Sequence, residues 1–277
     1  MADRRPIGVF DSGLGGLTVV KEIIKELPYE DIIYFGDTGR VPYGTRSVET
    51  IRKYTLEDEK FLLKNDVKLI VAACGTVSSV ASDTALQLPV PFFEVVSHAS
   101  QTAAKVTKNG KIGVIGTNAT VKSEQHKRHI QKIMPEAEVL TCSCPLFVPL
   151  VEEGWYSKND VVVTETVKRY LRPIIDFGAD TIILGCTHYP VLSAAIKNAV
   201  GDGVTLINAG TSTAQAVKDY LIKNELQTEN FDDGKHNFFV SDKPDSFRYQ
   251  ASILLGKDID ESQVQEVDLS SLRLRML

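Results

Sequence analysis

The chain has 277 residues, of which 43% are hydrophobic and 24% are charged. These fractions are typical of globular proteins and exclude a disordered or fibrous chain. Lys and Arg number 31 and Asp and Glu number 36, so the net charge of −5 argues against a nucleic-acid-binding surface over the whole molecule. At roughly 150 residues per domain, the length predicts about two domains.

No segment has the length and apolarity of a membrane span or a secretory signal. The longest stretches without Asp, Glu, Lys or Arg are residues 181–196 and 69–82. Both are shorter than the roughly 18 apolar residues that cross a bilayer. The apolar run that begins at Pro6 already stops at Asp11, which is too early for a signal core. We therefore expect a soluble cytoplasmic protein that does not bind membranes.

Short apolar runs alternate with amphipathic patterns along most of the chain. Several of these runs are apolar throughout, as expected of strands covered on both faces. Between them, apolar residues recur at steps of three and four, which places them on one face of a helix. Leu17, Val20, Ile24 and Leu27 form one such set, and Val163, Val167, Leu171 and Ile174 form another. Strands are predicted at residues 6–10, 31–35, 67–73, 90–96, 111–115, 137–141, 181–184, 203–207 and 237–240. The alternation predicts an α/β fold with parallel sheets and right-handed crossovers.

The two halves of the chain share a pattern that indicates an internal repeat. The Ile-Gly-Val of residues 7–9 recurs at residues 112–114, and the Cys-containing segment 71–76 has a counterpart at 183–187. Each half then ends with an apolar strand and a helix rich in Thr, Ala and Gln. Because α/β units bind ligands outside the carboxyl ends of their strands, two facing units would bring both cysteines to one cleft.

Cys74 and Cys186 each follow an apolar strand and precede small or hydroxylated residues. An isolated cysteine is most often a buried hydrophobic residue, but the duplicated placement favours function. A nearby helix start would favour a thiolate, and a thiol with a pKa of about 8.5 can act as acid or base. Two thiols across a cleft can remove a proton from one face of a tetrahedral carbon and return one to the other face. A redox pair is the alternative, although a Cys-X-X-Cys motif is absent.

Other loops carry polar groups, each with a structural alternative. Residues 11–16 form either an anion-binding turn or a simple strand-to-helix turn, with Asp11 able to accept or steer a proton. His188 either assists the nearby thiol or is a core histidine. Residues 42–45 can hold a carboxylate through hydroxyl and N–H groups, or form a Pro/Gly turn. Glu152 is expected to be solvated.

A metal site is not expected. Cys142 and Cys144 form an isolated pair, and so do His126 and His129, without residues that complete a ligand set. The two histidines flank Lys127 on a helix that we expect to be solvated. In a reducing compartment the cysteines are not expected to form a disulfide framework.

At these residues the sequence resembles the glutamate racemases of the aspartate/glutamate racemase superfamily. The matching segments are residues 11–19, 42–44, 73–76, 144–152 and 184–190, followed by Phe239, Val240 and Ser241 before Phe247. The resemblance implies two pseudosymmetric parallel-sheet α/β domains with the active site in the cleft between them. The first domain would comprise residues 1–97 and 209–277, and the second residues 98–208.

The resemblance also implies cofactor-independent racemisation of glutamate, which supplies D-glutamate for peptidoglycan, by a homodimer that needs neither pyridoxal phosphate nor a metal. Cys74 would take the α-proton of D-glutamate and Cys186 that of L-glutamate, assisted by Asp11 and His188, with Glu152 as an auxiliary carboxylate. The implied substrate-binding positions are Asp11, Ser12, Pro42, Tyr43, Gly44, Gly75, Thr76, Thr187 and His188.

The chain departs from the family at Gly75, where asparagine is usual. We expect a Gly75→Asn variant to fold and to change KM for glutamate more than kcat. Because Ile7 opens the first strand, we expect no N-terminal extension and no need for a cell-wall-precursor activator. A racemase for aspartate or another acidic amino acid is an alternative interpretation. A non-catalytic protein that binds an acidic metabolite is another.

Overall fold

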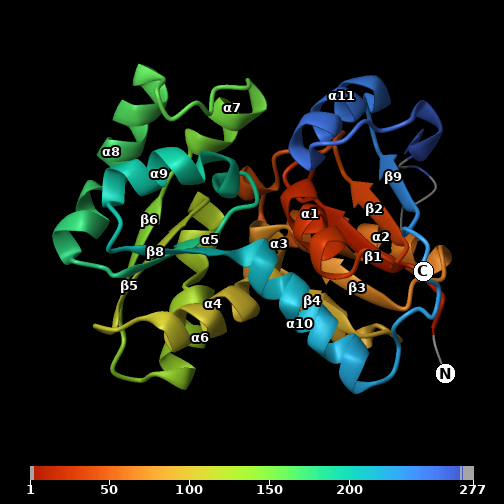
Figure 1. The fold of residues 1–277 in the computed structure, drawn as a ribbon, viewed down its shortest axis with the longest axis horizontal. Coiled ribbons are helices and arrows are strands. Elements are labelled where there is room, and N and C mark those ends of the chain that lie inside the picture. The colour runs from red at the N-terminus through yellow and green to blue at the C-terminus, as the bar shows by residue number, and fades with distance from the viewer. Residues whose placement is uncertain (1–2, 269, 271–277) are drawn as a thin grey trace.

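The computed structural model describes residues 3–268 and residue 270, and it contains two parallel β-sheets with helices on their faces (Figure 1). Among these residues, the first sheet has six strands in the order β10-β9-β2-β1-β3-β4, and the second has four in the order β6-β5-β7-β8. Every strand pair is parallel. The predicted α/β fold with two parallel-sheet units is therefore confirmed.

Ten strands are present in the described part of the chain, and nine of them coincide with predicted strands. They are β1 (Ile7–Asp11), β2 (Ile32–Gly36), β3 (Leu69–Ala72), β4 (Phe92–Glu94), β5 (Lys111–Gly116), β6 (Glu138–Ser143), β7 (Thr181–Leu184), β8 (Thr205–Asn208), β9 (His236–Val240) and β10 (Val264–Glu266). Strand β10, which the sequence did not predict, pairs with β9 at the edge of the first sheet. Strand β4 is shorter than predicted because Glu94 caps a helix by accepting from the backbone N–H groups of Val96 and Ser97.

Eleven α-helices connect these strands in the described residues. They are α1 (Leu17–Glu26), α2 (Val48–Lys64), α3 (Gly75–Val80), α4 (Val95–Val106), α5 (Asn118–Ser123), α6 (Gln125–Ile133), α7 (Phe147–Glu152), α8 (Val161–Phe177), α9 (Ser193–Val200), α10 (Ala209–Lys223) and α11 (Pro244–Leu255). The two amphipathic patterns correspond to α1 and α8, and the four apolar residues predicted to share a face of α8 are all buried. No helix among these is long and apolar enough to cross a membrane.

The two sheets have the same core topology. The order β2-β1-β3-β4 in the first sheet matches β6-β5-β7-β8 in the second, strand for strand along the chain. This agreement confirms the repeat that the sequence predicts. It also makes β3 and β7 equivalent, so that Cys74 and Cys186 leave equivalent strands at the same end of their sheets.

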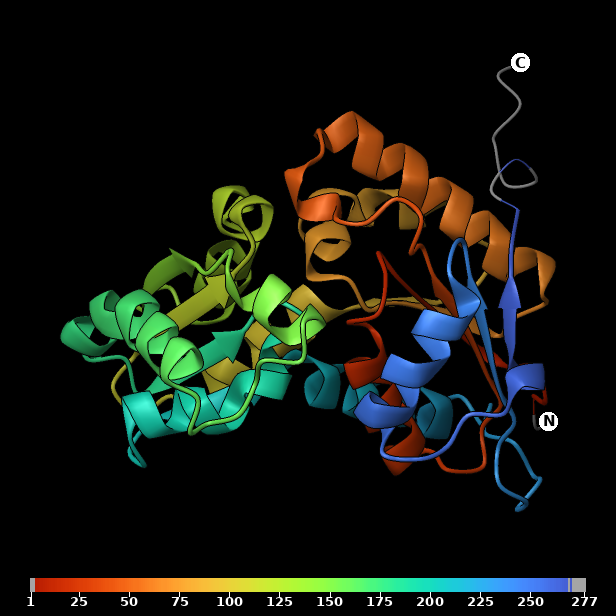
Figure 2. The same cartoon turned by 90° about the horizontal axis from the view of Figure 1, so that it is seen from above.

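Helices α4 and α10 join the two units. The chain leaves the first sheet through α4 and returns to it through α10, and these helices pack against each other (Figure 1). One hydrophobic cluster runs through both units and includes Val71 of β3, Ala99 of α4, Val114 of β5 and Val217 of α10. Figure 2 shows the units side by side, with α2 along one face of the first sheet. The shared core holds the two sheets in a defined position relative to each other.

Candidate active site

A cavity of about 330 Å³ lies between the two units, at the carboxyl ends of their strands. Every residue that the sequence assigned to the site lines this cavity, except Asp11. The lining residues are Ser12, Val41, Pro42, Tyr43, Gly44, Thr45, Cys74, Gly75, Thr76, Thr117, Asn118, Pro145, Val148, Pro149, Glu152, Gly185, Cys186, Thr187 and His188. The cavity thus brings together two cysteines that are 112 positions apart in the chain.

Cys74 enters the cavity from the first unit. It follows the buried strand β3 and is the N-cap residue of α3, where its carbonyl accepts from the backbone N–H and the hydroxyl of Ser78. Its Sγ lies 3.6 Å from Ser12 Oγ. Burial, followed by the negative charge of Asp11, raises the pKa of Cys74 to about 12. Cys74 is therefore a neutral thiol, ready to donate a proton.

Asp11 lies beneath the cavity at the end of β1. Its side chain is fully buried, and Oδ2 accepts from the backbone N–H of Gly13 at 3.0 Å. Oδ1 has no hydrogen-bond partner among the described residues. Burial raises the pKa of Asp11, whereas the charge of His188 and backbone N–H groups lower it. Asp11 acts electrostatically on the sulfur of Cys74 and on the His188 ring without touching the cavity.

Cys186 faces the cavity from the second unit, with a histidine and a carboxylate behind it. Cys186 Sγ lies 3.8 Å from Nδ1 of His188, and His188 Nε2 lies 3.3 Å from Oε1 of Glu152. Burial disfavours the charged imidazole, but the contacts with Cys186 and Glu152 outweigh it and raise the pKa of His188 to about 10. His188 is therefore an imidazolium at neutral pH, and an adjacent positive charge stabilises a thiolate.

The helix that carries Glu152 is anchored by aromatic packing. Glu152 is the last residue of α7, and its side chain is 41% exposed, so the expectation of a solvated carboxylate is only partly met. The ring of Phe147, in the same helix, packs on Tyr189 with centroids 5.1 Å apart. The hydroxyl of Tyr189 donates to the carbonyl of Cys144 at 2.9 Å. These contacts tie the segment that carries Glu152 to the segment that carries His188.

Tyr43 lines the cavity, but its hydroxyl points away from it. The side chain is buried, and Oη donates to the carboxylate of Asp37 and lies 3.0 Å from Asp58 Oδ2. The expectation that hydroxyl groups of residues 42–45 can hold a carboxylate is therefore wrong for Tyr43, because buried carboxylates compete for its hydroxyl. Gly44, in the same segment, packs close to Thr117 of the second unit.

The sequence interpretation missed several lining residues. Thr117 and Asn118 follow β5, and Thr117 Oγ1 lies 3.3 Å from Oγ1 of Thr76 across the cleft. The repeat carried the signal, since Thr117 follows β5 as Ser12 follows β1. Pro145, Val148 and Pro149 supply an apolar wall, and Val41, Thr45 and Gly185 complete the lining.

The remaining cysteines and histidines do not enter the cavity. Cys142 Sγ donates to the carbonyl of Tyr170 at 3.2 Å, and Cys144 is buried. His126 is also buried, with Nδ1 2.9 Å from Ser100 Oγ, so the expected solvated helix is wrong here because α6 packs on α4. Across the described part of the chain, no group of three or more Cys, His, Asp and Glu side chains is placed to hold a metal ion.

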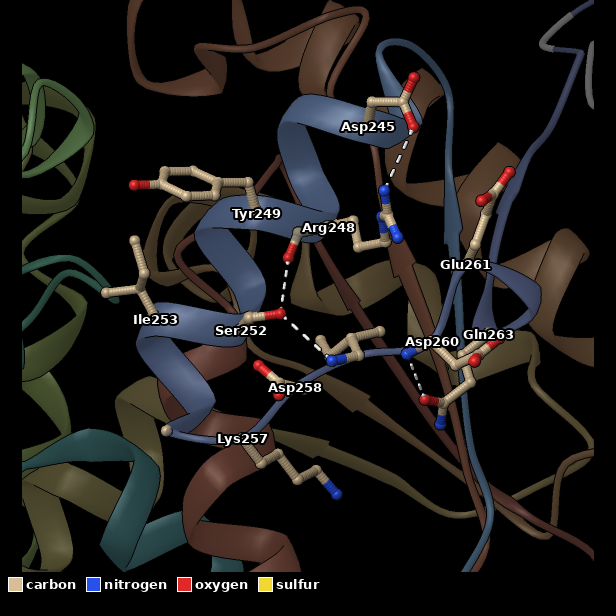
Figure 3. Close-up of a pocket in the computed structure, with 12 residues that line it drawn as sticks. Asp245, Arg248, Tyr249, Ser252, Ile253, Lys257, Asp258, Asp260, Glu261 and Gln263 are labelled. Carbon is tan, nitrogen blue, oxygen red and sulfur yellow. Dashed lines mark hydrogen bonds and ion pairs between the residues drawn. The ribbon is translucent and has the colours of Figure 1, made fainter.

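A second, larger hollow of about 1050 Å³ lies against α11 and the segment that follows it (Figure 3). Its wall carries charged side chains such as Asp245, Arg248 and Lys257, and Ser252 ties the segment to α11 by accepting from the N–H of Ile259. None of its lining residues is a cysteine or a histidine. The cavity between the units is therefore the one that presents groups suited to proton transfer at neutral pH.

Comparisons with known proteins agree on one family. Residues 7–217 match the family model described as Asp/Glu/Hydantoin racemase. The chain is 45% identical to a glutamate racemase of Geobacter metallireducens over 96% of this chain and 98% of the relative. It is 42% identical to one of Thermoanaerobacter pseudethanolicus over 96% and 98%.

Solved structures give the same result. A glutamate racemase of Bacillus anthracis superposes with a TM-score of 0.91 at 39% identity, over 96% of this chain and 98% of that one. A glutamate racemase of Francisella tularensis in complex with D-glutamate superposes with a TM-score of 0.89 at 37% identity, over 97% and 99%.

Proposed function

The chain belongs to the Asp/Glu/hydantoin racemase family and is an isomerase that racemises glutamate, and we propose that it does so with two thiols. One observation carries this proposal. Cys74 and Cys186 follow equivalent strands of the two units, and both line the same cavity. A racemase that uses two bases needs one group on each side of the α-carbon, and this placement can supply them.

The surroundings of the two thiols suggest how the proton moves. With L-glutamate bound, the Cys186 thiolate, stabilised by the His188 imidazolium, takes the α-proton from one face. The neutral thiol of Cys74 then donates its proton to the opposite face, which gives D-glutamate. Racemisation of D-glutamate runs through the same steps in reverse, with Cys74 as the base. Asp11 assists Cys74, and Glu152 keeps His188 protonated.

Small polar groups around the cavity are proposed to bind the substrate. Hydroxyls of Ser12, Thr76 and Thr187, backbone groups of residues 42–44, and the backbone of Gly75 surround the two thiols. Such groups can pair with both carboxylates and the ammonium of glutamate. Pro42 shapes the wall next to the backbone N–H groups. His188 completes the proposed set of substrate contacts, whereas Asp11, which the sequence also assigned to substrate binding, does not line the cavity and acts through Cys74 and His188.

We also propose the domain division 1–97 with 209–277, and 98–208. In support, the chain changes sheets between β4 and β5 and again between β8 and β9. We propose that the enzyme works in the cytoplasm and supplies D-glutamate for peptidoglycan, as the family resemblance implies.

A homodimer is proposed as well. Large apolar side chains are exposed close together in the chain around α7 and the start of α8, namely Leu146, Trp155, Tyr156, Val161 and Val162. Exposed apolar groups of this kind mark protein interfaces. Light scattering coupled to size-exclusion chromatography tests the dimer, and a monomer at micromolar concentration contradicts it.

Solvent labelling tests the two-thiol mechanism. In deuterated water, early product from D-glutamate should carry deuterium while the remaining substrate stays largely unlabelled, because each thiol delivers its own solvent-derived hydrogen. Cys74→Ala and Cys186→Ala should each abolish racemisation in both directions. Cys142→Ser, which changes a thiol outside the cavity, is the matched control and should retain activity.

Two results contradict the proposal. Substrate labelling as fast as inversion indicates a single base that exchanges its proton and returns it. Racemisation by Cys74→Ala or Cys186→Ala at the parent rate removes that thiol from the mechanism.

A parallel assay with aspartate tests substrate choice, and faster racemisation of aspartate than of glutamate contradicts the assignment of glutamate.

A further inference from the structure

The segment between β2 and α2 carries a wall of the cavity and is anchored by a buried polar cluster. Residues 41–45 all line the cavity, but the hydroxyl of Tyr43 turns back into the protein. The cluster comprises Asp37, Arg40, Tyr43, Glu57 and Asp58, and the three carboxylic side chains are each at most 1% exposed. The hydroxyl of Tyr43 is thus an anchor of the wall that surrounds the substrate.

Both oxygens of Asp37 accept hydrogen bonds from side chains. Oδ2 accepts from Arg40 Nε at 2.5 Å and from the hydroxyl of Tyr43, and Oδ1 accepts from Ser241 Oγ at 2.8 Å. Ser241 in turn accepts from the backbone N–H of Gly39 at 2.8 Å. Asp37 is therefore the acceptor in three hydrogen bonds, one of which comes from the Arg40 guanidinium.

Asp58 has a different set of contacts. Oδ1 accepts from Arg40 Nη2 at 3.1 Å, and among the described residues the one hydrogen-bond partner of Oδ2 is the hydroxyl of Tyr43, at 3.0 Å. The Tyr43 hydroxyl has a single proton, and that proton is used in the shorter contact with Asp37. The contact between Asp58 Oδ2 and Tyr43 Oη is a hydrogen bond only when Asp58 supplies the proton.

We propose that Asp58 is a neutral carboxylic acid that donates to Tyr43, and that the resulting chain from Asp58 through Tyr43 to Asp37 positions the substrate-binding segment. Asp58 is thus a positioning residue that acts through Tyr43. The effect on glutamate binding rests on the function proposed above, because it takes this cavity to be the glutamate site.

The charges around Asp58 agree with this assignment. Arg40 is the cation of the cluster and faces three carboxylic groups, because it also donates to Glu57. Burial and the charge of Asp37 raise the pKa of Asp58 well above its usual range, with a further contribution from Glu57, while Arg40 and Tyr43 oppose the shift. One cation cannot compensate three buried negative charges, so protonation of one acid lowers the electrostatic cost.

Two substitutions at position 58 test whether Asp58 donates a hydrogen bond to Tyr43 or accepts one from it. In Asp58→Asn, the amide can donate to Tyr43 while its carbonyl accepts from Arg40, which copies the hydrogen bonds of the neutral acid. Asp58→Leu has a similar size but offers no donor. We expect KM for glutamate to stay within about twofold in Asp58→Asn and to rise about tenfold in Asp58→Leu, with smaller changes in kcat. Tyr43→Phe, which removes the anchor itself, should match Asp58→Leu.

The proposal is overturned if KM for glutamate rises as much in Asp58→Asn as in Asp58→Leu. That result would show that Asp58 accepts a hydrogen bond from Tyr43 instead of donating one. A second measurement requires neither an activity assay nor a folded Asp58→Leu variant. It records the ¹³C carboxyl resonances of labelled aspartate in the parent protein. We expect one resonance at the position of a protonated acid at pH 7, absent in Asp58→Asn. If every aspartate resonance is that of a carboxylate, the proposal is wrong, whether or not the protein racemises glutamate.

Discussion

Gly75 of the first unit packs against Gly185 of the second: a methyl group on Gly75 would lie 2.5 Å from the carbonyl oxygen of Gly185. Real side chains do not approach a backbone oxygen so closely, so a side chain at position 75 requires the backbone at Gly75 or Gly185 to shift. Gly75 follows Cys74 and Gly185 precedes Cys186. A shift of the backbone at this contact therefore changes the position of Cys74 relative to Cys186.

We predict that Gly75→Ala lowers kcat by about tenfold or more, because small displacements of reacting groups have large effects on rate. Gly203→Ala is the matched control, since a Cβ there meets nothing within 4 Å. The contact also changes the expectation for Gly75→Asn: kcat should fall as well as KM change. Steady-state kinetics with circular dichroism detection measure both, and an unchanged kcat in Gly75→Ala contradicts the prediction.

The ion pair of His188 and Glu152 predicts the alkaline limb of the pH profile. Because the pKa of His188 is raised to about 10, the imidazolium should support activity up to about pH 10. Glu152→Gln removes one group that raises this pKa, so kcat should begin to fall at a lower pH than in the parent. A pH–rate profile of both proteins tests this. An identical alkaline limb shows that Glu152 does not act on His188.

The same pair has a defined effect on stability. A histidine whose pKa is raised in the folded state stabilises the fold fully below its unfolded pKa of about 6.5, and this contribution is lost as the pH rises to about 10. The difference in Tm between the parent and Glu152→Gln should therefore be largest below about pH 6.5 and disappear above about pH 10. Calorimetry across this range measures it, and a difference that grows with pH contradicts the sign.

A buried ion pair far from the cavity predicts a change in stability. Lys68 Nζ donates to Glu30 Oε2 at 2.6 Å and to the carbonyls of Asp3 and Leu226 at 2.8 and 3.0 Å. Lys68→Met leaves Glu30 buried without its cation, which costs about 3–5 kcal/mol of unfolding free energy. Adding Glu30→Gln should recover part of this loss. Urea denaturation measures the effect, and a single variant as stable as the parent contradicts it.

The control for that experiment is Lys168→Met. Lys168 pairs with Glu165 at 2.9 Å on the exposed face of α8. Exposed pairs contribute at most about 1 kcal/mol, so this variant should remain close to the parent in stability. A similar loss in both variants would show that the measured effect is not specific to the buried pair.

Cofactor independence is a further prediction. The thiols of Cys74 and Cys186, assisted by Asp11 and His188, provide both proton transfers. Protein treated with a chelator and shown by absorbance to lack pyridoxal phosphate should racemise glutamate at the untreated rate. Activity that disappears with the chelator and returns with an added metal contradicts this expectation.

The strands and the thiol loops could be predicted because their signals are local. Apolar runs mark the buried strands, and the repeat places Cys74 and Cys186 at equivalent strand ends. Strand β10 was missed because Val264, Gln265 and Glu266 form no apolar run, and only pairing with β9 makes them a strand.

Other features depend on contacts between segments that are distant in the chain. The Tyr43 hydroxyl turns away from the cavity because Asp37 and Asp58 compete for it. The contact between Gly75 and Gly185 exists only once the two units are assembled. No periodicity or composition within one segment reports such partners.

The two thiols occupy equivalent positions in unlike surroundings: Ser12 and Asp11 lie near Cys74, and an imidazolium backed by Glu152 lies behind Cys186. Mirror-image amino acids have identical free energies in water, so the equilibrium constant of their interconversion is one. Thermodynamics then requires equal kcat/KM in the two directions at every pH, however different the bases are. The difference between the two sides of the site can therefore appear only as a difference in kcat that is matched by an equal difference in KM. The enantiomer with the higher kcat must also have the higher KM.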